Sequence, residues 1–280
     1  MFSTRFKVAR HFAFALLATV AVTATAAAQG GFNAYAVTTS DRLVQFNTAS
    51  PCVVSTPLKI EGLANNEQVL AIDFRPATGE LYALGSSSRL YVIDPATAVV
   101  IKVIAISTTL EGSAFGFDFN PTVDRIRIVS DTGQNLRVNP NTGVALVDGR
   151  LAYAISDRNA GIPPSVAGAA YTNPDNDPNT GTMLFDIDFA LDVLALQSPP
   201  NDGTLVTVGS LGLRTNDLLG FDISPGNYAF AAMKLAGGGK PTCGNSTLTQ
   251  INLTTGVANE IGEIGTAQPI RAFAIFLAQP

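Results

Sequence analysis

The sequence predicts an all-β protein folded as a β-propeller, and the repeat count favours five blades while leaving six open. Three observations support this fold: a strand-rich unit recurs, no helical periodicity separates its strands, and the two ends of the chain complement each other. Similar apolar runs occupy residues 69–76, 114–121 and 218–225. Tandem repetition of units built from short strands is typical of a radial array. An open β-sandwich is the rival all-β fold, but it requires no tandem repeat.

The first strand of each unit is apolar and leads into an Asp-x-x-Pro turn that begins at Asp73, Asp118 or Asp222. An Asp carboxylate can accept backbone N–H groups of the following turn, and proline fixes φ at the corner. We therefore expect these acids to cap turns rather than to form a functional ring at the axis. Further strands follow at residues 80–84 and 89–93 in one unit and at 125–129 and 135–138 in the next.

The fourth unit is the least regular. Its inner strand is expected at residues 166–171, with Tyr171 where other units carry Asp, while residues 151–155 form either an extra strand or the true inner strand. Unit starts near residues 70, 114, 166, 218 and 270 give five blades.

The two ends of the chain are expected to share one blade. The final run, residues 270–276, resembles an inner strand with no partners after it. Residues 34–38 and 42–46 supply the missing partners, so the ring closes and no sheet edge is left at the seam.

The N-terminal segment has the pattern of a secretory signal peptide. Arg5, Lys7 and Arg10 precede an apolar run at residues 12–22, and small residues at 26–28 suit cleavage. We therefore predict a signal peptide at residues 1–28 and a single propeller domain at 29–280, secreted or periplasmic and monomeric. A membrane anchor is the alternative, disfavoured because the apolar run is short. No second long apolar run follows, so no membrane span is expected in the mature chain.

Composition restricts the possible functions. Removing residues 1–28 removes three basic residues and no acidic one, which changes the net charge from −5 to −8. This charge argues against nucleic acid as a partner. The single histidine, His11, lies inside the predicted signal peptide, and the chain contains no tryptophan. The mature protein therefore has no Ser-His-Asp triad and no imidazole-ligated metal.

Two polar clusters and one cysteine pair are candidate sites. Asp175, Asp177 and Asn179 place oxygen ligands at alternate positions and are candidates for calcium, the one cofactor considered, although the sequence favours a plain polar turn over a calcium site. Three arginines, Arg125, Arg127 and Arg137, could share one face and bind an anion, or form an ion-pair network. The only cysteines, Cys52 and Cys243, could pair after export, and the sequence leaves this open.

The runs at residues 116–127, 130–137 and 199–205 resemble a family of secreted bacterial proteins known as domain of unknown function 4394. The resemblance implies an exported bacterial protein with a propeller-like fold, and it brings no catalytic residues. We predict a non-enzymatic binding or scaffold protein. Its ligand, either another protein or a small molecule, is not identified by the sequence. The alternatives are a carboxylate- and metal-dependent hydrolase or lyase in the channel, and a calcium-stabilised surface or matrix protein.

Overall fold

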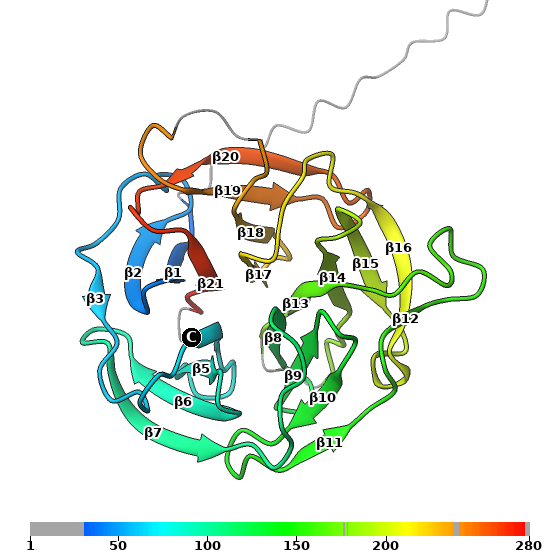
Figure 1. The fold of residues 1–280 in the computed structure, drawn as a ribbon, viewed down its shortest axis with the longest axis horizontal. Helices are drawn as coiled ribbons and strands as arrows, with labels where there is room; N and C mark the ends of the chain where they lie inside the picture. Colours follow the sequence, from blue (N-terminus) through cyan, green and yellow to red (C-terminus); the bar gives the residue numbers. More distant parts are fainter. Residues whose placement is uncertain (1–30, 176, 178, 238–240, 278–280) are drawn as a thin grey trace, which may run out of the picture.

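The computed structural model describes residues 31–175, 177, 179–237 and 241–277, and shows five β-sheets arranged around one axis (Figure 1). The predicted five-bladed β-propeller is confirmed. The predicted signal peptide at residues 1–28 lies outside the described residues. Within the described part of the chain, no helix has the length and apolar character needed to cross a bilayer.

The blades are numbered along the chain, and their strands are given from the axis outward. Blade 1 contains β21 (Ile270–Ile275), β1 (Asn33–Thr38), β2 (Arg42–Asn47) and β3 (Leu58–Lys59). Blade 2 contains β4 (Val69–Phe74), β5 (Leu81–Gly85), β6 (Arg89–Asp94) and β7 (Val99–Ala105). Blade 3 contains β8 (Phe115–Asn120), β9 (Arg125–Ser130), β10 (Asn135–Val138) and β11 (Ala145–Val147). Blade 4 contains β13 (Val166–Tyr171), β14 (Leu184–Asp188), β15 (Val193–Gln197), β16 (Thr204–Ser210) and β12 (Ala152–Tyr153), and blade 5 contains β17 (Leu219–Ile223), β18 (Ala229–Met233), β19 (Ser246–Ile251) and β20 (Ala258–Ile264).

The two ends of the chain meet in blade 1, as predicted. Strand β1 pairs antiparallel with β2 on one side and with β21 on the other, so that Ala36 lies opposite both Val44 and Phe273. The C-terminal strand thus supplies the innermost position of a blade whose other strands are N-terminal. This arrangement closes the ring through hydrogen bonds between the two ends.

Strand pairing shows which segment of the irregular fourth unit forms its inner strand. Its inner strand is β13, and residues 152–153 form the extra strand β12, which runs parallel to the outer strand β16 with Ala152 opposite Thr204. Between β15 and β16 lies a single 3₁₀ turn, η1 (Pro200–Asp202). This turn faces blade 3 and forms one wall of the pocket described below.

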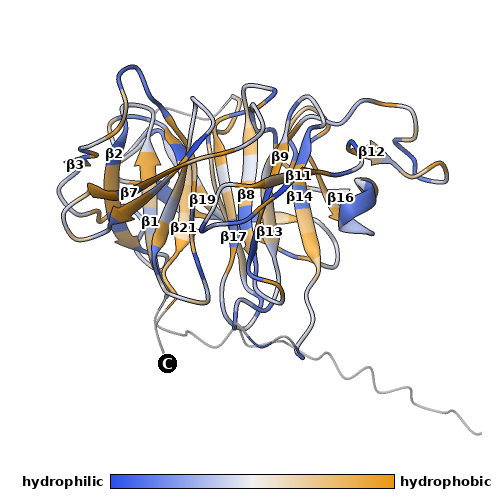
Figure 2. Ribbon diagram, turned by 90° about the horizontal axis from the view of Figure 1, so that it is seen from below, coloured by the Kyte–Doolittle hydropathy of each residue, from blue (hydrophilic) through white to orange (hydrophobic). Residues whose placement is uncertain are grey.

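The inner strands approach one another so closely that the axis is nearly filled. A Cβ atom on Gly116 would lie 2.6 Å from the Ala169 nitrogen, and one on Gly220 would lie 2.4 Å from the Phe273 nitrogen. The space left between the inner strands measures about 10 Å³. Hydrophobic residues concentrate on the strands around this axis, whereas many connecting loops are hydrophilic (Figure 2). The axis is therefore part of the packed core and not an open channel.

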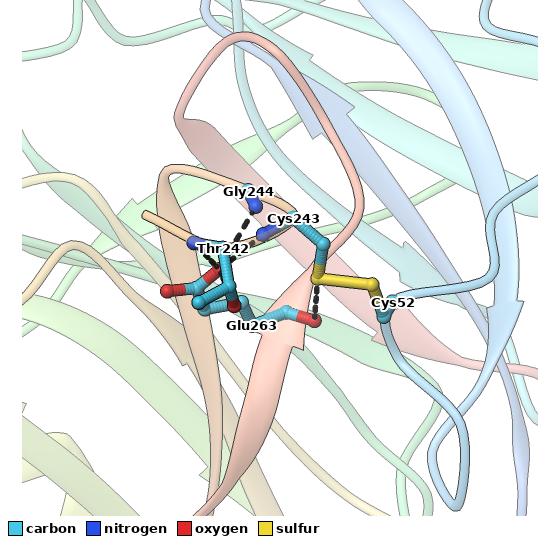
Figure 3. Close-up of a disulfide and its surroundings, with 5 residues drawn as sticks. All are labelled: Cys52, Thr242, Cys243, Gly244 and Glu263. Carbon is cyan, nitrogen blue, oxygen red and sulfur yellow. Dashed lines mark hydrogen bonds between the residues drawn. A yellow bond between two sulfur atoms is a disulfide. The ribbon is translucent and has the colours of Figure 1, made fainter. Parts of the chain in front are cut away.

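A disulfide between Cys52 and Cys243 joins blade 1 to blade 5, with their Cα atoms 5.9 Å apart (Figure 3). Next to it, the Glu263 carboxylate accepts the backbone N–H groups of Thr242, Cys243 and Gly244 at 2.7, 2.6 and 3.1 Å. Hydrogen bonds from the Cys243 N–H and the Thr242 hydroxyl lower the pKa of Glu263 to about 2. The ionised carboxylate thus orders the loop that carries Cys243.

Candidate functional site: an arginine pocket between blades 3 and 4

The interface between blades 3 and 4 differs in chemistry from its neighbours. On β9, Ile126 and Ile128 pack into the apolar cluster shared with blade 2, and the intervening Arg127 faces blade 4. Only Val129 of blade 3 belongs to the apolar cluster on the blade 4 side. The strand alternation of period two therefore sends an apolar row to one interface and a cationic row to the other.

Arg127 is 2% exposed and is held by side chains of both blades. Its Nη1 donates to Asn135 Oδ1 and Asp148 Oδ2, each at 2.7 Å. Its Nη2 donates to Asn201 Oδ1 at 2.8 Å, and its Nε donates to the Tyr171 hydroxyl at 3.3 Å. Arg127 is thus a clamp between the blades, and one of its five N–H groups has no partner in these contacts.

The three arginines singled out from the sequence lie on one face of blade 3. Arg127 is directly opposite Arg137 on β10, and Arg125 lies two residues before Arg127 on the same strand. All three line a pocket of about 250 Å³, which we call the arginine pocket. Its remaining lining residues are Asn120, Val123, Ile126, Tyr171, Pro200 and Asn201.

The arginine pocket has more cations than anions. The Asp148 carboxylate is shared, because Arg127 reaches it at 2.7 Å and Arg137 binds it through both Nε and Nη2, at 2.7 and 2.9 Å. Arg125 donates only to the backbone carbonyls of Val123 and Asp124, and within the described residues it forms no ion pair.

The Asp124 carboxylate does not balance the charge of Arg125, since it accepts a hydrogen bond from Arg75 Nε at 2.8 Å on the opposite side of the blade. Among the described residues, Asp148 is thus the one carboxylate that pairs with any of these three guanidinium groups. In a chain whose formal net charge is −5, this is a local reversal of charge sign, and an anion is the ligand that balances it.

Asp186 and Gln197 lie deeper in the same interface. Both are buried, and the two Asp186 carboxylate oxygens and Gln197 Oε1 have no hydrogen-bond partner among the described residues. Burial raises the pKa of Asp186 well above its usual range, against the opposing charge of Arg127. The raised pKa favours the neutral, protonated form of this carboxyl group.

A second cluster of charge lies at the axis. Carboxylate oxygens of Asp73, Asp118 and Asp222 lie within 4.8 Å of one another, and all three side chains are buried. Burial raises the pKa of each acid, to about 6 for Asp222, and the neighbouring carboxylates raise the pKa of Asp73 and Asp118 further. We call this group the axial carboxylate cluster.

The axial acids correct one prediction made from the sequence. They were expected to cap the turn that follows, but each instead accepts an N–H group from the inner strand of another blade. Asp73 accepts from Phe119 N at 2.9 Å and Asp222 from Ile275 N at 2.6 Å, and the Tyr171 N–H bonds Asp118. These hydrogen bonds join the inner strands of different blades.

The proposed calcium loop makes local contacts. Asp175 Oδ1 accepts the Asp177 N–H at 3.0 Å, and Asp177 Oδ1 accepts the Asn179 N–H at 2.9 Å. These are the bonds of successive Asx turns, in which an Asp oxygen accepts the N–H two residues on.

Sequence reasoning missed several residues of the arginine pocket. Asp148 lies in a loop that no repeat covers, so no pattern marks it. Asn135 and Asn201 lie in the runs 130–137 and 199–205 that carry the family resemblance, but nothing in those runs assigns them a role. Tyr171 carried a signal: it replaces the inner-strand Asp of other units. Its ring spans the interface, and burial raises the pKa of its hydroxyl, which stays neutral beside Arg127.

Comparisons with known proteins place the chain in a family. A family model described as a domain of unknown function (DUF4394) matches residues 42–274. No curated protein matches the sequence. Similar solved structures include YCF48 bound to D1 peptide, with a TM-score of 0.42 and 9% identity over 82% of this chain and 63% of that chain. This chain therefore spans less than two thirds of that one. Another is the glutaminyl cyclase of Myxococcus xanthus, with a TM-score of 0.44 and 12% identity over 72% of this chain and 90% of that chain.

Proposed function

The chain belongs to the DUF4394 family, whose description names no activity. We propose that it is an exported, non-enzymatic propeller that binds an anionic ligand in the arginine pocket. The observation that carries the proposal is the excess of guanidinium groups over carboxylates in a pocket of about 250 Å³. Guanidinium groups bind carboxylate, sulfate and phosphate oxygens through paired N–H groups.

The pocket chemistry favours binding over catalysis. Its lining offers arginine, asparagine and a neutral tyrosine, which hold and orient an anion but supply no general base at neutral pH. The axial carboxylate cluster is another group of titratable side chains, but its three acids are buried and accept N–H groups of the inner strands. Buried carboxylates that are bonded to the backbone do not offer a substrate a free acid or base.

Export is part of the proposal. The predicted signal peptide directs the chain out of the cytoplasm. A disulfide between Cys52 and Cys243 suits an oxidising compartment.

The proposal is tested by titrating the purified protein with sulfate, phosphate and acetate and following binding by calorimetry and thermal unfolding. A ligand that binds only the folded state raises the unfolding temperature with its concentration. We expect at least one anion to bind, and Arg125→Gln and Arg137→Gln to weaken binding at least tenfold.

The matched control is Arg150→Gln, since Arg150 is an exposed arginine of the same region that pairs with Glu111 and does not line the pocket. Binding unchanged by Arg125→Gln and Arg137→Gln, or equally weakened by Arg150→Gln, would refute the assignment of the anion to this pocket.

A further inference from the structure

We propose that the ligand of the arginine pocket is a carboxylate carrying a short aliphatic chain, with the carboxylate at Arg125 and Arg137 and the chain in an adjoining hollow. This inference rests on the proposed function, because it names the class of anion that the same site takes. It is carried by a second cavity that shares the two arginines.

The second cavity, which we call the outer hollow, measures about 180 Å³ and is lined by Arg125, Arg137, Asn139, Val144 and Leu146. Leu146 on β11 lies directly opposite Arg137 on β10, so the two side chains stand next to each other on one face of the blade. Arg125 and Arg137 therefore form the boundary between the arginine pocket and the outer hollow, with guanidinium groups at the centre and aliphatic side chains at the far end.

The outer hollow offers a ligand apolar contact and few hydrogen bonds. Val144 and Leu146 are 56% and 55% exposed, which is high for aliphatic residues that line a concave site. The Asn139 side-chain oxygen is already occupied, because it accepts the Asn141 and Thr142 N–H groups at 2.9 and 3.3 Å.

The polar groups of Arg137 that face the blade are occupied too, since Nε and Nη2 bind Asp148. Apart from the two arginines, the Asn139 amide NH2 is the polar group of this lining that has no partner among the described residues, and Val144 and Leu146 supply aliphatic contact. An alkyl chain therefore loses less on entering the outer hollow than a second polar group, which would give up its hydration for one hydrogen bond at most. The charge of the first cavity and the apolar lining of the second together select an amphipathic anion.

The test is a calorimetric series with acetate, butanoate and hexanoate on the full chain, with sulfate as an anion without a chain and hexan-1-ol as a chain without a charge. We expect the dissociation constant to fall about two- to fourfold for each added methylene, the range expected from partial to full burial of that group. Hexan-1-ol should not bind measurably.

The critical variant is Leu146→Asn, which should flatten the series and leave acetate binding unchanged. The matched control is Ile101→Asn, because Ile101 is 63% exposed on β7, the outer strand of blade 2, away from both cavities. This control should leave the series as it is in the natural protein.

The outcomes separate the two proposals. Anion binding that does not depend on chain length, or hexan-1-ol binding as tightly as hexanoate, overturns the aliphatic-carboxylate inference while the anion pocket stands. Failure of sulfate, phosphate and every carboxylate to bind overturns both.

Discussion

The axial carboxylate cluster and the arginine pocket each contain several groups of the same charge. They differ in how far these groups are buried and in whether each has hydrogen-bond partners. At the axis, Asp73 and Asp222 are buried, and each accepts N–H groups from two inner strands. In the arginine pocket, Arg127 donates four of its five N–H groups to side chains, whereas Arg125 donates only to backbone carbonyls, and both line a cavity of about 250 Å³.

The two clusters are linked by the sheet register, since Asp118 of the axis lies directly opposite Arg127 of the arginine pocket. One face of blade 3 thus runs from an acidic, closed end to a basic, open end. Clustering of charge alone therefore says little about function. What separates a structural cluster from a ligand site is access to solvent and whether each charged group already has its partners.

The largest expected effect is on Arg127. Arg127→Met removes a buried cation and leaves Asp148, Asn135 and Asn201 without their shared donor. Breaking a buried pair by removing one partner costs about 3–5 kcal/mol, and we expect a loss of this size in the free energy of unfolding, measured in urea. An equal loss in the free energy of unfolding for Arg127→Met and Arg125→Met would contradict the distinction between a structural arginine and a ligand-binding one.

The axial carboxylate cluster predicts a pH dependence. Because burial raises the folded-state pKa of these acids above the usual value of 3.8, the native state retains protons that the unfolded chain releases. Stability is therefore fully present below pH 4 and is lost as the pH rises through the folded-state pKa, about 6 for Asp222. From the shift at Asp222, we expect a fall of about 2 kcal/mol in the free energy of unfolding between pH 4.5 and pH 8.

Asp186 and Glu263 also titrate differently in the folded protein, and each bears on the pH dependence of stability. Asp186 also has a raised pKa and adds to the same trend, whereas the lowered pKa of Glu263 acts below pH 4.5, outside the interval. The variant Asp118→Asn retains an acceptor for the Tyr171 N–H and removes one charge, so its pH dependence should be flatter and its stability at pH 8 higher. A free energy of unfolding that is constant from pH 4.5 to pH 8 would contradict the raised pKa values.

The fold could be predicted from the sequence because each blade repeats the same local pattern. The inner strands β4, β8 and β17 carry the apolar run with Asp, and the strand β21 has no partner strand after it in the sequence. Together these features predict five blades closed by the two ends. Strand periodicity likewise places Arg125 and Arg127 on one face, because residues two apart in a strand share a face.

The details of the site could not be predicted in this way. The charge balance of the arginine pocket depends on Asp148, and Asn201 forms part of its wall; both lie outside the strands and meet Arg127 only when blades 3 and 4 pack together. The hydrogen bonds of Asp73 and Asp222 were assigned to the wrong partners for the same reason: an inner strand of a neighbouring blade is distant in sequence, and local turn chemistry gives no information about it.

A smaller effect is expected at Asp186, whose carboxylate oxygens have no partner among the described residues. Replacing a buried polar group that makes no hydrogen bond with an apolar one of similar volume is neutral or stabilising. We expect Asp186→Leu to change the free energy of unfolding by less than about 1 kcal/mol at pH 7, with stabilisation as the favoured sign. A loss of several kcal/mol, measured in urea, would show instead that Asp186 binds a group essential to the interface.

The smallest expected effect on stability is at Arg125, and its sign distinguishes a ligand-binding residue from a structural one. Arg125 lies beside Arg127 and Arg137 with no carboxylate of its own, so Arg125→Gln removes repulsion and breaks no ion pair. We expect the unliganded variant to match or exceed the natural protein by up to about 0.5 kcal/mol in low salt, with Arg150→Gln as the surface control. The same variant should lose the stabilisation that added anion gives the natural protein. A destabilisation above about 1 kcal/mol without anion would assign Arg125 to the structural group with Arg127, and the open end of blade 3 would then resemble the axis more than a binding site.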